Sequence, residues 1–282
     1  MIKDVLVHLD GGEGDELRLQ HAEAIAVISA AHLTGLFTNR LADITAVVPI
    51  DGGAAAAQVM ADLEEEGRRQ GDIVQQRLAE RFSRISVPNE IRRIDATPGQ
   101  LANRAASEAR CADLFVASRP YDGNGSAKWD ALFEAVLFES GRAIYLVPPG
   151  RRPADAIRRV LVAWRDTKEA ARAVAAAMPF IEKATRAVIV VVDQNTGRSN
   201  EEHGTAMDLA RHLDRHGTSV EVQMLDSDSQ PASEIILDQA SRMSADLVVM
   251  GGYGHSRARE WVLGGTTLEM LEGSEFPILM EH

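Results

Sequence analysis

The chain has 282 residues, of which 45% are hydrophobic and 26% are charged, and its formal net charge is −12. This length is typical of two domains, each large enough to bury its own core. Both halves are acidic, which disfavours binding to a phosphate backbone, so we expect no nucleic-acid partner.

The sequence gives no sign of a membrane segment or of a disulfide framework. No apolar run approaches the ~20 residues that a membrane helix needs. Lys3 and Asp4 interrupt the apolar residues at the start, which is unlike a signal peptide, so we expect a cytoplasmic protein with no membrane partner. Cys111 is the single cysteine, and its place before Ala112 and an apolar run predicts a core residue rather than a reactive thiol.

In the first half, apolar runs with strand character alternate with segments of helical periodicity. Strands are predicted at 3–9, 32–38, 90–94, 112–118 and 143–147. Helices are predicted at 15–31, 54–81, 99–110 and 128–140. The second of these helices contains Gly67 and Gly71, which predict a break near one of them because glycine weakens a helix interior.

The second half shows the same alternation. Strands are predicted at 158–164, 187–192, 218–224, 246–250 and 276–280, and helices at 167–182, 201–216, 232–243 and 266–272. Strands that alternate with helices of this length indicate parallel sheets covered on both faces. We therefore predict an α/β protein of two tandem doubly wound, Rossmann-like domains, each with a five-stranded mostly parallel sheet flanked by helices.

A long repeat supports the division into two domains. Segment 97–118 lines up without gaps on segment 230–251, which indicates duplication of a whole domain. The predicted domains are 1–148 and 156–282, joined by a proline-rich and charged linker. A duplicated domain keeps its self-complementary surface, so we expect an intrachain pseudo-dimer about a pseudo-two-fold axis, with contact through the last strand of each half. Further assembly into a homo-oligomer stays open.

The chemistry of the chain centres on the stretch GGYGHSRAREWVLGGTT at 251–267, which follows a predicted strand and leads into a predicted helix. A strand, a glycine-rich turn and a helix N-terminus together form a phosphate site, because glycines let backbone N–H groups approach the anion and the helix dipole favours negative charge. Thr266 could cap the helix, with Glu269 completing a capping box. The alternative is that the glycines only form turns. The residues predicted to surround the phosphate are Gly251, Gly254, His255, Gly264, Gly265, Thr266 and Thr267.

The spacing of these glycines separates this loop from other phosphate loops. The sequence has no G-x-x-x-x-G-K-[ST], and no G-x-G-x-x-G follows the first strand. The pattern G-x2-G-x9-G resembles the ATP-binding signature of the universal stress protein family. The resemblance is close over the last part of the chain. It implies a tandem universal stress protein that binds an adenine nucleotide, ATP, with or without Mg²⁺, and it implies the same doubly wound fold.

In the universal stress protein family, an aspartate after the first strand contacts the adenine. Asp10 stands at that position in the first half, and Arg165 stands at the aligned position in the second. The first half also breaks the glycine spacing, in segment 118–135. We therefore predict a degenerate site in the first half, with Asp10 as its remnant, and the better site in the second. Arg165 could either fill the adenine end of that site or pair with a phosphate.

The sequence indicates no catalytic or metal-binding residues. It has no G-x-S-x-G, H-E-x-x-H or C-x-x-C motif. His212 and His216 lie one helical turn apart, for which we favour a solvated surface pair over a metal site. Large aromatic side chains are predicted to pack in the cores or at the domain junction: Trp164, Phe180 and Trp261.

Two functional hypotheses of different classes follow from these patterns. The first is a stress-response binding module whose nucleotide occupancy biases its conformation or its partners. The second is an ATP-hydrolysing or nucleotidyl-transfer enzyme that uses the same pocket. A structural paralogue with an empty pocket is a third possibility.

Overall fold

The structure is a computed structural model that describes residues 1–43, 53–121, 129–193, 199–253 and 265–282. Its strands are β1 (Asp4–Leu9), β2 (His32–Arg40), β3 (Asn89–Ala96), β4 (Leu114–Ser118), β5 (Ala143–Val147), β6 (Arg159–Ala163), β7 (Arg186–Asp193), β8 (Val220–Asp226), β9 (Leu247–Gly251) and β10 (Ile278–Glu281). Its helices are α1 (Asp15–Ser29), α2 (Gly53–Phe82), α3 (Pro98–Ala109), α4 (Asp130–Glu139), α5 (Lys168–Ile181), α6 (Ser199–Arg215), α7 (Ala232–Arg242) and α8 (Gly265–Gly273). Among these helices, none is both long and apolar enough to cross a membrane.

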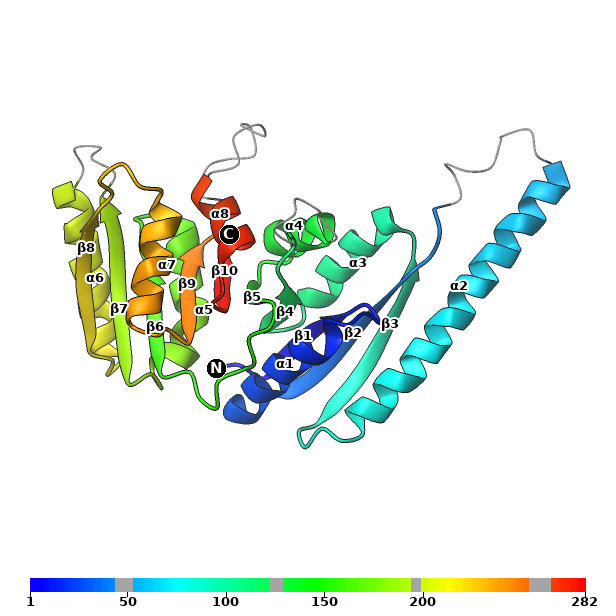
Figure 1. Ribbon diagram of the computed structural model, residues 1–282. Helices are drawn as coiled ribbons and strands as arrows, with labels where there is room; N and C mark the ends of the chain where they lie inside the picture. The colour runs from blue at the N-terminus through cyan, green and yellow to red at the C-terminus, as the bar shows by residue number, and fades with distance from the viewer. Residues whose placement is uncertain (44–52, 122–128, 194–198, 254–264) are drawn as a thin grey trace.

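The strands form one continuous sheet in the order β3-β2-β1-β4-β5-β10-β9-β6-β7-β8 (Figure 1). Neighbouring strands are parallel within each half, and β5 and β10 pair antiparallel at the centre. Read outward from this central pair, the two halves have the same strand order, so a pseudo-two-fold axis passes between β5 and β10. The α/β doubly wound fold and the predicted contact between the last strands are confirmed.

Helices cover both faces of the sheet, as the continuous apolar runs of the strands require. Two hydrophobic clusters fill the space between the layers, one beneath α1, α2, α5 and α6 and the other beneath α3, α4, α7 and α8. Successive residues of a strand enter opposite clusters: Val5 and Val7 belong to the first and Leu6 to the second. Each cluster contains residues of both halves, so the cores continue across the pseudo-two-fold axis.

The segment between β5 and β6 is tied to both halves of the molecule. The guanidinium of Arg151 donates to the carbonyls of Ala245 (2.8 Å) and Glu275 (3.2 Å) and lies 4.7 Å from the centre of the Phe276 ring. Its backbone carbonyl lies 2.8 Å from Nε2 of His21, which is buried in the first half. The predicted linker therefore also fastens the two halves together.

Helix α2 is continuous, so the predicted break near Gly67 or Gly71 is wrong. The two glycines serve close packing instead. A Cβ atom on Gly71 would overlap the side chains of Asn39 and Arg93, and one on Gly67 would lie 3.0 Å from Cδ2 of Leu41. The carbonyl of Gly67 also accepts a hydrogen bond of 3.0 Å from the Asn39 side chain. Glycine at these positions lets the helix lie directly on the side chains of Leu41, Asn39 and Arg93 at the edge of the sheet.

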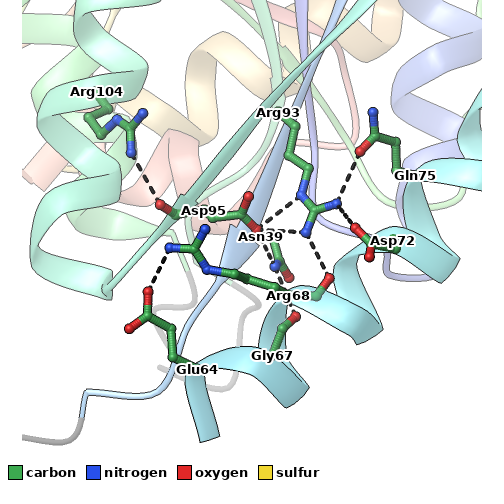
Figure 2. A network of polar contacts seen from close by, with 9 residues as sticks. All are labelled: Asn39, Glu64, Gly67, Arg68, Asp72, Gln75, Arg93, Asp95 and Arg104. Atoms are coloured by element: carbon green, nitrogen blue, oxygen red, sulfur yellow. Dashed lines mark hydrogen bonds and ion pairs between the residues drawn. The ribbon is translucent and has the colours of Figure 1, made fainter. Parts of the chain in front are cut away.

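A polar network fixes α2 against β3 at this place (Figure 2). The guanidinium of Arg93 donates to carboxylate oxygens of Asp95 (2.8 Å) and Asp72 (2.5 Å), to the side chain of Gln75 (3.1 Å) and to the carbonyl of Arg68 (2.8 Å). Burial alone would lower the pKa of Arg93, but these hydrogen bonds to carboxylates raise it overall. The network therefore holds a permanently charged guanidinium between the helix and the sheet.

Cys111 is exposed, so its prediction as a core residue is wrong. It lies in the turn between α3 and β4, one residue before the buried Ala112, and its side chain points away from the core that Ala112 enters. It lines a cavity of about 250 Å³ together with His32, Arg92 and Glu108.

The packing of α2 predicts opposite effects for two glycine substitutions. Gly204 of α6 has no atom within 4 Å of an added Cβ, so Gly204→Ala should raise the free energy of unfolding by about 0.5–1 kcal/mol, the usual gain in a helix interior. Gly71→Ala should lower it by about 1–3 kcal/mol, because the methyl group displaces Arg93 and Asn39. Chemical denaturation of both variants measures the difference. A Gly71→Ala protein as stable as Gly204→Ala would show that the contact is loose.

Candidate functional site

The candidate site lies at the carboxyl edge of the second half of the sheet. Strand β6 lies between β7 and β9. After β6 the chain continues to β7 and β8 on one side, and it then crosses to form β9 on the other side. In open α/β sheets, ligands bind at this switch point, outside the carboxyl ends of the strands. Ala163 pairs with Met250 at these ends, so the residues that follow β6 and β9 lie side by side. The start of α8 lies at the same edge (Figure 1).

The predicted site residues divide into two groups. Gly254, His255 and Gly264 lie outside the described residues, as does Trp261. The structure brings the others of the second half to the switch point: Gly251 at the end of β9, Arg165 after β6, and Gly265, Thr266 and Thr267 in the first turn of α8. Asp10 lies at the equivalent edge of the first half, after β1.

Gly251 is required by the packing of α5. A Cβ atom on it would lie 2.6 Å from the backbone nitrogen of Ala170 and 2.8 Å from the carbonyl carbon of Glu169. The first turn of α5 therefore rests directly on the end of β9. The N-terminus of α5 carries its own cap, because the Thr167 hydroxyl accepts a hydrogen bond of 3.2 Å from Ala170. This contact accounts for the glycine whether or not a ligand is bound.

The first turn of α8 differs from the predicted capping box. The helix begins at Gly265, so Thr266 lies inside the first turn rather than at the N-cap. One carboxylate oxygen of Glu269 accepts a hydrogen bond from the Ser233 hydroxyl of α7, and the other lies 3.2 Å from the position that a Cβ atom on Gly265 would take. The capping-box prediction is therefore wrong, because the partner helix α7 offers Glu269 a donor that the local sequence does not show.

Thr267 connects the helix to the strand end before it. Its side chain is buried, and its hydroxyl lies 3.5 Å from the backbone nitrogen of Tyr253. Of the two preceding residues, Gly265 is exposed and Thr266 is partly buried. Backbone N–H groups in the first turn of a helix have no partner within the helix. The start of α8 therefore presents donors and the positive end of a helix dipole to the switch point.

Arg165, two residues after the end of β6, supplies a positive charge at the same edge of the sheet. It is exposed, and within the described parts of the chain it forms no ion pair. Its neighbour Trp164 is partly buried, packs against the hydrophobic core as predicted, and donates from its indole nitrogen to the Thr205 hydroxyl at 3.2 Å. The indole ring is thus fixed to α6, while the guanidinium of Arg165 extends into solvent.

The equivalent place in the first half contains a buried ion cluster. The guanidinium of Arg18, 2% exposed, contacts the carboxylates of both Asp10 and Asp15. Asp15 also accepts hydrogen bonds of 2.9 Å from the backbone of Asp10 and Gly11. Burial raises the pKa of Asp15 despite the opposing charge of Arg18. The carboxylate of Asp10 is therefore held within the protein by Arg18.

The strand registers make the two halves directly comparable. Val5 pairs with Leu114 in β1–β4, and Val160 pairs with Leu247 in β6–β9, so Asp10 and Arg165 occupy equivalent positions. Counting onward, the positions of Asp15 and Arg18 correspond to Ala170 and Ala173. Asp15 and Arg18 were not predicted as site residues, and this comparison of the two copies is the signal that could have revealed them.

His8 and Trp129 are two further residues that the sequence analysis missed. His8 is buried at the carboxyl end of β1, with Nε2 2.8 Å from the Thr38 hydroxyl. The rings of His8 and Trp129 meet edge to face, with their centres 4.7 Å apart. Trp129 directly precedes α4, so an aromatic side chain covers the strand end in the first half.

Comparisons with known proteins agree with this geometry. Residues 156–281 match the model of the universal stress protein family. A universal stress protein of Synechocystis is 31% identical over 86 residues, which are 29% of this chain and 29% of that protein. Two solved structures show the same fold over 99% of this chain. The first is a universal stress protein of Archaeoglobus fulgidus, with a TM-score of 0.73, 17% identity and 95% of that chain covered. The second is described as a putative universal stress protein of Pseudomonas aeruginosa, with a TM-score of 0.61, 14% identity and 93% covered.

The family match and the geometry fall on the same segment of the chain. The segment 156–281 contains β6, β9 and α8, whose ends form the switch point described above. The second half of the chain therefore carries a domain of the universal stress protein family.

Proposed function

We propose that the chain is a tandem universal stress protein that binds one adenine nucleotide, ATP, in its second half. In this proposal it acts as a non-catalytic or slowly hydrolysing module of the stress response. The observation that carries the proposal is the meeting of Arg165, the ends of β6 and β9 and the start of α8 at one switch point, within the segment that matches the family.

The chemistry of this place suits a polyphosphate. The first turn of α8 offers backbone donors and a positive dipole end, which favour an anion. The exposed guanidinium of Arg165 can pair with two phosphate oxygens at once. Gly254, His255 and Gly264 complete the phosphate loop in this proposal, on the strength of their spacing in the sequence. Gly251 contributes through its packing on α5, which sets the end of β9.

A magnesium ion would enter this site with the nucleotide. Among the described residues, no group of three or more histidine, cysteine, aspartate or glutamate side chains could hold a metal ion. Mg²⁺ in nucleotide sites is bound mainly through substrate phosphates and water. The protein would therefore contribute charge and donors to the phosphates rather than a metal-binding cage.

The first half differs at the position that would face the adenine. There the carboxylate of Asp10 is paired with Arg18, and Trp129 covers the neighbouring strand end at His8. If Asp10 turned toward a nucleotide, Arg18 and Asp15 would stay buried without its carboxylate. Removing one partner from a buried ion cluster destabilises the protein. We therefore propose that the first half is a universal stress protein-like domain that leaves the nucleotide to the second half.

The stoichiometry of binding tests this division between the halves. Titration of the full chain with ATP in a calorimeter should give about one nucleotide per chain. Asp10→Ala should leave that number unchanged, because Asp10 is occupied by Arg18. Two equivalent sites per chain, or loss of binding in Asp10→Ala, would contradict the assignment.

Arg165 should contribute directly to the affinity for ATP. We expect Arg165→Gln to weaken binding about tenfold at low salt, as loss of a charge-assisted hydrogen bond would do, and to weaken it less as salt increases. Arg186→Gln is the matched control: it removes the same charge at the opposite end of the sheet, where Arg186 pairs with Glu221 at 2.9 Å. Equal effects of the two variants would mean that only net charge matters.

The alternative function is an enzyme that hydrolyses ATP or transfers a nucleotidyl group from the same pocket. A turnover assay with ATP and Mg²⁺ separates it from a binding module. We expect rates far below the ~1 to 10³ s⁻¹ typical of enzymes. Rates within that range would establish the enzyme, and complete lack of binding in calorimetry would favour the structural paralogue.

A further inference from the structure

Helix α8 of the second half is held at its C-terminal end by an arginine from the first half. Arg119 follows β4 and donates from Nη1 to the carbonyls of Glu272 (2.6 Å) and Ser274 (3.0 Å). The last carbonyls of a helix have no partner within the helix, and its C-terminal end carries partial negative charge. A guanidinium at this place satisfies two acceptors and complements the dipole.

This contact is made at a cost in solvation, which indicates that it is specific. Arg119 is partly buried, and its Nε atom is buried without a hydrogen-bond partner among the described residues. Burial lowers the pKa of the guanidinium, while the charge of Glu275 acts in the opposite direction. A flexible arginine could regain water by turning outward. It instead stays directed at the end of α8.

Among the described residues, no arginine of the second half binds the end of α4 in return. The register of β4 and β9 makes Arg119 equivalent to Gly252, which has no side chain to reach back with. A Cβ atom on Gly252 would lie 2.7 Å from Sδ of Met280, so no larger residue fits there. The arginine at the C-terminal end of α4 comes from its own half: Nε of Arg110 donates to the Glu139 carbonyl at 3.1 Å. Across the axis, this end of α4 meets only rings, with Phe138 4.6 Å from His282 and 5.5 Å from Tyr253 among the described residues.

A second contact with the first half lies near the beginning of α8. Tyr253 is the last residue described before position 265, and its backbone nitrogen faces the hydroxyl of Thr267. Its ring lies 5.5 Å, centre to centre, from the ring of Phe138 on α4. Its hydroxyl is buried without a hydrogen-bond partner among the described residues, and burial, with Tyr121 as a smaller influence, raises its pKa. Residues of the first half therefore touch both the end of α8 and the strand end that leads toward it.

We propose that the first half positions α8 of the second half through Arg119, and thereby sets the affinity of the site at the start of that helix. The affinity part of this inference rests on the proposed nucleotide binding. Coupling between sites is reciprocal, so a ligand at the start of α8 also stabilises the contact of Arg119 at its end. In this way the occupancy of the second half is communicated to segment 119–121 of the first.

The test compares three variants of the full chain: Arg119→Ala, Arg119→Lys and the matched control Arg110→Ala, which removes the arginine that binds the end of α4. Hydrogen exchange of the amides in 265–273 reports the stability of α8, and calorimetry with ATP reports affinity. Arg119→Ala should speed exchange in α8 and weaken ATP binding about fivefold or more. Arg119→Lys should recover part of both, because an ammonium group still complements the helix end. Arg110→Ala should change neither.

The two readouts keep this inference distinct from the proposed function. If the wild type binds ATP and Arg119→Ala matches Arg110→Ala in exchange and affinity, the inference is overturned and the proposed function stands. If the wild type binds no ATP, the proposed function fails, and the exchange of α8 in Arg119→Ala decides the positioning role by itself. If Arg119→Ala does not fold, the same comparisons are made with Arg119→Lys, for which smaller changes in the same direction are required.

Discussion

The antiparallel pairing of β5 and β10 is the contact on which the rest of the architecture depends. Leu146 pairs with Ile278 and Tyr145 with Leu279, all buried side chains at the centre of the sheet. Without this pairing each half would end in an exposed, apolar edge strand, which invites association with other chains. The pairing joins two five-stranded sheets into one and lets both hydrophobic clusters run through the whole molecule.

The same pairing determines which parts of the two halves meet. It places α4 of the first half beside the end of β9 in the second, so that Phe138 contacts Tyr253. It also brings the residue after β4 to the far end of α8, where Arg119 binds two carbonyls. The strand order is therefore symmetric about the central pair, whereas the side chains that meet across it are not.

The fold was predictable from the sequence because it depends on local periodicity and on a repeat. Alternating strand and helix patterns, and a gap-free alignment of 97–118 on 230–251, are sufficient to predict the strands, the doubly wound fold and the contact between the last strands. The errors share a different cause, which is tertiary packing. From the sequence, Gly71 is expected to break the helix, but in the structure it provides room for Arg93. Glu269 is expected to cap α8, but it binds Ser233.

The candidate site could be predicted in part, because glycine spacing shows where a backbone can approach a ligand. It does not show which glycines already serve packing, as Gly251 does beneath α5. Nor does it show the partners of a charged residue. Asp10 alone suggests an available carboxylate, whereas its pairing with Arg18 became visible only in three dimensions. Comparison of the two copies would have shown that Arg18 corresponds to an alanine, Ala173.

The two copies distribute charge at the switch point in opposite ways. In the first half, one guanidinium lies between two carboxylates, and burial raises the pKa of Asp15 because the single positive charge of Arg18 does not fully compensate for both. The charges of that cluster pair with one another inside the protein and need no ligand as a partner. In the second half, alanines stand at the positions of Asp15 and Arg18, and the exposed Arg165 stands at the position of Asp10. The first half therefore pairs its charges inside the protein, whereas the second half presents an exposed guanidinium at the same edge of the sheet, which leaves that charge accessible to an anion.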